Sequence, residues 1–211
     1  MIRVKICGLT TLEDALLAIE AGVELLGFNF HLSSPRYISP ADCARLVSAL
    51  ANFRPRLQLV GVFVNTPPEQ IRRILASCSL DLAQLSGDEP AEDLANLGAL
   101  AFKAFRPADP DELERLLESY PQRRQPPACL LDGYRPGQYG GTGQVADWSL
   151  AAGLARRVPM LLAGGLRPEN VAQAVAEVRP WGVDVASGVE SSPGRKDPDR
   201  LRAFIQAVRT L

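Results

Sequence analysis

The feature that most constrains the fold of this chain is a regular alternation of short apolar runs and longer helical patterns. The apolar runs have strand length and predict strands over 2–7, 24–30, 57–64, 81–85, 100–105, 128–132, 159–164 and 182–187. The patterns between and after them predict helices over 11–21, 40–50, 67–78, 89–97 and 110–119, from 147, from 168, and over 197–211. Each strand–helix unit takes about 26 residues, which implies a parallel sheet with right-handed crossovers.

Eight such units are the number that closes into a (β/α)8 TIM barrel, and we expect one barrel domain over residues 1–211. The alternative α/β architecture is a doubly wound open sheet. That fold normally has fewer strands and a Gly-rich phosphate-binding turn directly after the first strand. Here the first strand ends in Cys7-Gly8-Leu9, which lacks that pattern. The Pro-rich stretch 121–127 is explained as a loop rather than as a linker between domains.

Charge and hydropathy exclude several classes of partner. Lys and Arg number 23 and Asp and Glu number 24, so the formal charge is −1. Nucleic acids and anionic membranes both require a basic excess, and no apolar run approaches the ~20 residues of a membrane span. The first ten residues enter a strand pattern without a signal-peptide core. We therefore expect a cytoplasmic protein that binds neither nucleic acid nor membrane.

The cysteines and the single histidine limit the chemistry. The four cysteines form no CxxC pair, and His31 is the only histidine. Zinc ligands usually cluster at short spacings, so we expect no metal site and no cofactor. His31 itself is most simply a loop residue. Proton transfer is then expected to use Asp, Glu, Cys or Lys.

In a TIM barrel the active site lies at the carboxyl ends of the strands. Two Gly-containing segments, 163–166 and 186–190, follow the last two strands, and a short helical turn is expected in the second. Backbone N–H groups at such turns bind anions, and these two loops form the usual phosphate site of the fold. We predict a phosphate site at Gly164, Gly165, Ser187 and Gly188. The alternative is that these glycines only make tight turns.

Two candidate catalytic residues end strands. Cys7 ends the first strand and is either a small core residue or a reactive thiol at the mouth of the barrel. Asp132 ends the sixth strand, and a carboxylate there is costly to bury without partners. It is therefore expected to face water, a cap or a ligand.

Other polar residues near the carboxyl ends of the predicted strands each have two interpretations. Arg36 is either a solvated loop charge or a guanidinium that holds a carboxylate by two hydrogen bonds. Lys5 is either a cation inside the barrel or the partner of a carboxylate such as Asp184. The segment 137–143, which includes Gly141 and Thr142, is either a flap that closes over a ligand or a plain flexible loop.

The segments KICGLT, GFNF, SPRYISP, GVFVN, YGGTG, LAGGLRPENV and VDVASGVESSPGRKD follow one another in chain order. Together they resemble the phosphoribosylanthranilate isomerase family of tryptophan biosynthesis, over nearly the whole chain. The resemblance implies an aldose–ketose isomerase that performs an Amadori rearrangement of N-(5-phosphoribosyl)anthranilate. The product is 1-(2-carboxyphenylamino)-1-deoxy-D-ribulose 5-phosphate.

The resemblance also implies roles for named residues. Cys7 corresponds to the general base, Asp132 to the general acid, and Arg36 to the arginine that binds the anthranilate carboxylate. The other residues that we expect to bind substrate are Gly141, Thr142, Gly164, Gly165, Asp184, Ser187 and Gly188. The family contains monomers and dimers, so either a monomer or a homodimer is expected.

The chain departs from the family pattern at two places. Ser86 replaces the family histidine after the fourth strand, and VADW replaces TFDW at 145–148. Two rival functions also remain. A related isomerase of histidine biosynthesis generally has an aspartate at the end of the first strand and a two-fold sequence repeat. A non-enzymatic phosphate-binding barrel would need neither Cys7 nor Asp132.

Overall fold

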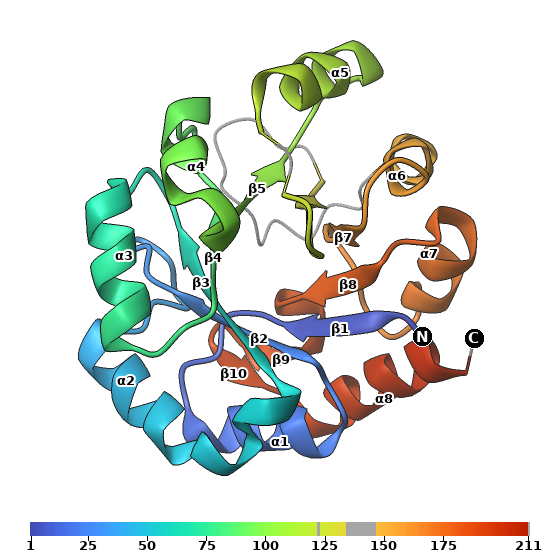
Figure 1. Ribbon diagram of the computed structural model, residues 1–211. Coiled ribbons are helices and arrows are strands. Elements are labelled where there is room, and N and C mark those ends of the chain that lie inside the picture. The colour runs from blue at the N-terminus through green and yellow to red at the C-terminus, as the bar shows by residue number, and fades with distance from the viewer. Residues whose placement is uncertain (122, 134–146, 211) are drawn as a thin grey trace.

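The computed structural model describes residues 1–121, 123–133 and 147–210. Its parallel strands pair in chain order, and β1 pairs with β8 to close a barrel (Figure 1). The strands are β1 (Arg3–Ile6), β2 (Leu25–Asn29), β3 (Gln58–Phe63), β4 (Leu82–Leu85), β5 (Ala101–Phe105), β6 (Cys129–Leu131), β7 (Met160–Leu162) and β8 (Gly182–Val185). The predicted TIM barrel is confirmed, and the doubly wound alternative is wrong.

A ring of helices surrounds the barrel (Figure 1). They are α1 (Leu12–Glu20), α2 (Pro40–Ala49), α3 (Pro68–Ser77), α4 (Ala91–Leu97), α5 (Pro110–Ser119), α6 (Trp148–Ala155), α7 (Val171–Val178) and α8 (Pro198–Arg209). The first turns of several are capped by the side chain that precedes them, as at Thr11, Ser39 and Asp197. No helix in the described part of the chain has the length and apolarity needed to span a membrane.

The structure differs from the predicted elements in four places. Helix α7 begins at Val171 rather than Pro168, because residues 168–170 form a turn that Asn170 ties to the preceding loop. The 3₁₀ helices η1 (Ala51–Arg56) and η2 (Gly98–Leu100) were not predicted. Nor was the short antiparallel pair β9 (Glu190–Ser192) and β10 (Arg195–Lys196) between β8 and α8. The expected helical turn after β8 is η3 (Ser187–Val189).

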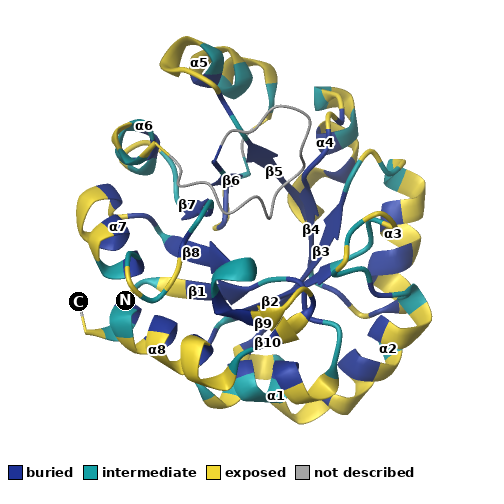
Figure 2. Cartoon of the chain, turned by 180° about the vertical axis from the view of Figure 1, so that it is seen from behind, coloured by how far each residue is buried: buried dark blue, intermediate teal, exposed yellow. Residues whose placement is uncertain are grey.

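Apolar side chains pack in two layers because strand residues alternate between the two faces of the barrel wall. The larger layer lies between the strands and the helices, whose outer faces are exposed (Figure 2). The smaller layer fills the barrel interior and consists of Leu25, Val60, Leu82, Phe102, Ala104, Leu130, Leu161 and Ala163. Polar residues replace this apolar layer toward the carboxyl ends of the strands, where the candidate site lies.

Candidate active site

A pocket of about 460 Å³ opens at the carboxyl ends of the strands. This size is typical of sites for small molecules. The predicted site residues that line it are Cys7, Arg36, Asp132, Gly164, Gly165, Asp184, Ser187 and Gly188. The predicted residues Gly141 and Thr142 lie outside the described residues. His31 also lines the pocket, so the loop that carries it borders the site.

Cys7 follows β1, and its N–H donates to the carbonyl oxygen of Val185 at the end of β8 (2.9 Å). The thiol is partly exposed to the pocket. Gly27 in β2 makes room for it, because a Cβ at that position would lie 2.9 Å from Cys7 Sγ and 3.1 Å from Lys5 Nζ. Gly27 was missed by the sequence analysis, since its role depends on which side chain the neighbouring strand presents.

Lys5 is fully buried and pairs with Asp184 across the β1–β8 seam, with Nζ 2.9 Å from Oδ1. The interpretation of Lys5 as the partner of a carboxylate therefore agrees with the structure. Burial lowers the pKa of Lys5, but Asp184 and Cys7 outweigh it, so that pKa lies above its ordinary value. The lysine is charged at neutral pH.

Two opposing influences act on the pKa of the Cys7 thiol. Burial raises the pKa of Cys7, and Lys5 opposes this increase without cancelling it. At neutral pH the thiol is therefore neutral and lies beside a lysine cation. Lys5 by itself therefore does not make the thiolate the resting form.

Asp132 follows β6, and its N–H donates to the carbonyl oxygen of Phe105 (3.0 Å). One carboxylate oxygen accepts from the N–H of Gly133 at 2.8 Å. Burial raises the pKa of Asp132 to about 6, although the Gly133 hydrogen bond works in the opposite direction. A carboxyl group with this pKa can donate a proton near neutral pH, as a general acid must.

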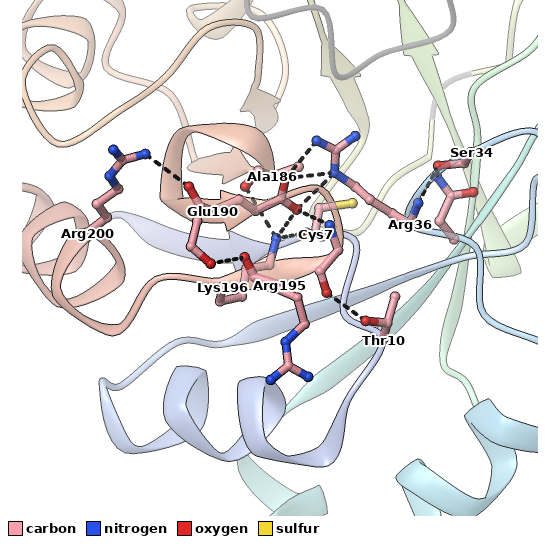
Figure 3. Close-up of polar contacts among 12 residues, drawn as sticks. Cys7, Thr10, Ser34, Arg36, Ala186, Glu190, Arg195, Lys196 and Arg200 are labelled. Carbon is pink, nitrogen blue, oxygen red and sulfur yellow. Dashed lines mark hydrogen bonds and ion pairs between the residues drawn. The ribbon is translucent and has the colours of Figure 1, made fainter.

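Arg36 is not a solvated loop charge. Its Nε donates to Oε1 of Glu190 at 2.9 Å, and its Nη2 donates to Oε2 at 2.7 Å (Figure 3). Gly8 allows this placement, because a Cβ there would lie 2.5 Å from Arg36 Cδ. Burial raises the pKa of Glu190, but Arg36 and Lys196 outweigh it and hold that pKa below its ordinary value. Glu190 is not among the residues that the sequence pattern predicts for the site.

The two phosphate-site loops lie against each other. Gly164 and Gly165 both have positive φ, at 92° and 60°. A Cβ on Gly188 would lie 1.9 Å from the carbonyl oxygen of Leu166, so only glycine fits where the second loop crosses the first. This packing places the loops after β7 and β8 side by side in the lining of the pocket.

The opposite wall carries the residue at the family's histidine position. Ser86 is buried, its hydroxyl accepts from Gln84 Nε2 at 3.1 Å, and its carbonyl accepts from Arg106 Nη1 at 2.6 Å. All three residues line the pocket. No group of three or more His, Cys, Asp or Glu side chains within the described ranges is placed to hold a metal ion.

The pocket combines a thiol, a carboxyl group with a pKa near 6, and a paired arginine. Glycine-rich loops after β7 and β8 complete it. These groups can transfer protons to and from a small anionic ligand.

Comparisons with known proteins identify the family of the chain. The family model described as N-(5'phosphoribosyl)anthranilate (PRA) isomerase matches residues 4–207. The N-(5'-phosphoribosyl)anthranilate isomerase of Myxococcus xanthus is 50% identical, with 100% of this chain and 97% of that protein covered. The protein of the same name from Geobacter sulfurreducens is 46% identical, with 99% of each covered.

Solved structures give the same result. Phosphoribosylanthranilate isomerase from Thermotoga maritima has a TM-score of 0.88 and 41% identity, and both chains are covered completely. A phosphoribosylanthranilate isomerase structure with reduced 1-(o-carboxyphenylamino)-1-deoxyribulose 5-phosphate has a TM-score of 0.85 and 40% identity, again with complete coverage of both chains. The chain belongs to the N-(5'-phosphoribosyl)anthranilate isomerase family.

Proposed function

We propose that this protein isomerises N-(5-phosphoribosyl)anthranilate to 1-(2-carboxyphenylamino)-1-deoxy-D-ribulose 5-phosphate, a step of tryptophan biosynthesis. Membership of the family supports the reaction. The observation that carries it is the presence in one pocket of a thiol at the end of β1 and a carboxyl group with a pKa of about 6 at the end of β6. Those are the two proton-transfer groups that an Amadori rearrangement requires.

Asp132 acts as the general acid in this proposal. It donates its proton to the furanose ring oxygen, the C1′–O bond breaks, and the nitrogen lone pair forms an iminium ion at C1′. The raised pKa of Asp132 supports this role, because about one carboxyl group in ten keeps its proton at pH 7, whereas at the ordinary pKa of 3.8 fewer than about one in a thousand would.

Cys7 acts as the general base. Its thiolate removes the proton from C2′, and the electron pair of that C–H bond forms the enolamine, which tautomerises to the ketone. The iminium cation, together with Lys5, favours loss of the Cys7 thiol proton to solvent, which leaves the thiolate in place to act as the base. Each positioned proton transfer contributes roughly 10²–10⁴-fold to the rate.

The remaining predicted residues bind the anionic ends of the substrate. Arg36 binds the anthranilate carboxylate, and the loops with Gly164, Gly165, Ser187 and Gly188 bind the 5-phosphate through backbone N–H groups. Asp184, Gly141 and Thr142 are proposed as further substrate contacts. A cytoplasmic location and assembly as a monomer or homodimer remain predictions.

A fluorescence decay assay with freshly prepared phosphoribosylanthranilate tests the function. The purified protein should consume the substrate with saturation kinetics, and the Cys7→Ala/Asp132→Asn double variant should not. The aminoaldose of histidine biosynthesis is assayed in parallel. Turnover of that compound alone would assign the rival isomerase function. Binding of substrate without turnover would instead point to a phosphate-binding protein.

A further inference from the structure

Glu190 is a buried carboxylate between two cations from distant parts of the chain. It opens β9, and its side chain is only 4% exposed. Arg36, 154 residues away along the chain, donates to it from the loop after β2, and Lys196 in β10 donates to Oε1 at 2.9 Å. Figure 3 shows both side chains directed toward Glu190. One carboxylate thus fixes two cations beside the pocket.

Glu190 binds only one edge of the Arg36 guanidinium, so another edge remains for a ligand. Glu190 occupies the edge formed by Nε and Nη2. Nη1 makes no hydrogen bond to any residue that the structure describes, and Arg36 lines the pocket. A planar guanidinium can bind two carboxylates on two of its edges. The edge formed by Nη1 and Nη2 therefore has the geometry for a second carboxylate.

The charges support a second carboxylate. Arg36, Lys196 and Glu190 together carry one net positive charge, which a substrate carboxylate neutralises. Lys196 is fully buried and also donates to the carbonyl oxygens of Cys7 (2.7 Å) and Ala186 (3.3 Å). The carboxylate that orients Arg36 is thus joined through Lys196 to the ends of β1 and β8.

Glu190 is itself held rigidly. Its carbonyl oxygen accepts from Arg200 Nη1 at 3.0 Å. The far side of the β9–β10 pair is tied down by Thr10, whose hydroxyl donates to the carbonyl of Gly194 at 2.7 Å. The N–H of Lys196 donates to Asp14 in α1 at 3.1 Å. A carboxylate anchored in this way can preorganise a flexible arginine before the ligand arrives.

We propose that Glu190 is a positioning residue: it holds the Arg36 guanidinium so that the Nη1–Nη2 edge receives the substrate carboxylate. The inference rests on the proposed role of Arg36. Glu190 does not touch the reacting atoms. Its loss should therefore weaken binding of substrates that carry the carboxylate more than of substrates that lack it. Loss of an ion pair with only a structural role would affect both kinds of substrate equally.

The test compares Glu190→Gln with Glu89→Gln. Glu89 is the matched control, because it is also buried and pairs with a buried lysine, Lys103, at 2.9 Å. It does not line the pocket. We expect Glu190→Gln to raise KM for phosphoribosylanthranilate by about tenfold or more, the effect of one charge-assisted interaction, with a smaller change in kcat. Glu89→Gln should leave KM unchanged.

Two further arms separate positioning from loss of structure. The analogue N-(5-phosphoribosyl)aniline lacks the carboxylate, so Glu190→Gln should change its KM by less than about twofold. In an Arg36→Met background, Glu190→Gln should have no further effect on KM. If Glu190→Gln does not fold, Glu190→Asp is used instead, because it retains the charge on a shorter side chain. It should raise KM for the substrate with the carboxylate, by less than Glu190→Gln, and leave KM for the analogue without it nearly unchanged.

The outcomes are distinct. An unchanged KM in Glu190→Gln, or an equal rise for the substrate with and without the carboxylate, overturns the proposal. An unchanged KM in Arg36→Met places the carboxylate elsewhere and removes the basis of the positioning role, while the reaction itself stands. Absence of turnover by the unmodified protein contradicts the proposed function instead.

Discussion

Lys5 Nζ and Asp184 Oδ1 lie 2.9 Å apart inside the barrel, and the residues that carry them are direct partners in the register of β1 and β8. The lysine side chain is wholly buried and that of the aspartate is 10% exposed. The ion pair therefore joins the two strands that close the barrel, directly below the thiol of Cys7. A buried charge in this position depends on its partner for stabilisation.

Removing one member of this pair should be costly. We expect Lys5→Met to lower the free energy of unfolding by roughly 3–5 kcal/mol, because it leaves the Asp184 carboxylate buried without its cation. The double variant Lys5→Met/Asp184→Leu should recover much of that loss. Urea denaturation of the wild type, the single and the double variants measures both effects. Equal losses in the single and double variants would show that packing, and not charge pairing, sets the stability here.

Loss of either proton-transfer group should act on the chemical step. Cys7→Ala and Asp132→Asn should each lower kcat by at least ~10²-fold with little change in KM. Cys43→Ala is the control, because Cys43 is a buried residue of α2 and does not line the pocket. Steady-state kinetics in the fluorescence assay measure both parameters. A kcat near that of the wild type in either pocket variant contradicts the assignment of its role.

The raised pKa of Asp132 makes a prediction about stability. At pH 8 the carboxylate is charged in the folded and unfolded states, and only the folded state bears the cost of burying that charge. Asp132→Asn should therefore stabilise the protein at pH 8. A rise in pKa from 3.8 to about 6 limits the gain to roughly 3 kcal/mol.

This stabilisation should disappear as the pH falls from about 6 to below 4, where the wild-type carboxyl is protonated in both states. Denaturant unfolding of the two proteins at pH 8, 6 and 4 gives the difference directly. A constant difference across this range would mean that the pKa of Asp132 is not perturbed.

The predicted phosphate site requires the phosphate to come close to the backbone N–H groups of the loops after β7 and β8. Gly165→Val should raise KM for the phosphorylated substrate, because a side chain there blocks the amide surface. A substrate without the 5-phosphate should be poor for the wild type and no worse for the variant. Gly98→Val is the control, since Gly98 also has positive φ (57°) but has open space around its Cβ position. Equal weakening of both substrates would make Gly165 a structural residue.

The barrel and most of its site could be predicted from the sequence because they depend on local patterns. Apolar runs specify strands, and α5 occupies 110–119 as predicted. Cys7 and Asp132 stand at strand ends, so the fold alone brings them to one pocket. Pro168 favours a helix start, but α7 begins only at Val171, because the Asn170 side chain donates to the carbonyl of Gly165 and accepts from the N–H of Arg167.

The missed residues are those whose role depends on distant partners. Glu190 and Lys196 lie in a polar Gly- and Pro-containing segment, which favours an exposed turn. Glu190 is buried against Arg36, which lies 154 residues away along the chain, and Lys196 is buried against Glu190 and the carbonyl oxygen of Cys7. Gly27 is needed only because β1 presents Cys7 and Lys5 to it. No local pattern contains these pairings.

The pairing of β1 with β8 also determines when the site can exist during synthesis. Cys7 and Lys5 leave the ribosome well before Asp184, which follows Lys5 by 179 residues, and before Glu190 and Lys196. Until β8 emerges, Lys5 lacks its counterion and its charge favours contact with water. Docking of β8 closes a long loop and completes the pocket in one event. In a nascent chain, acquisition of ligand binding therefore reports barrel closure itself.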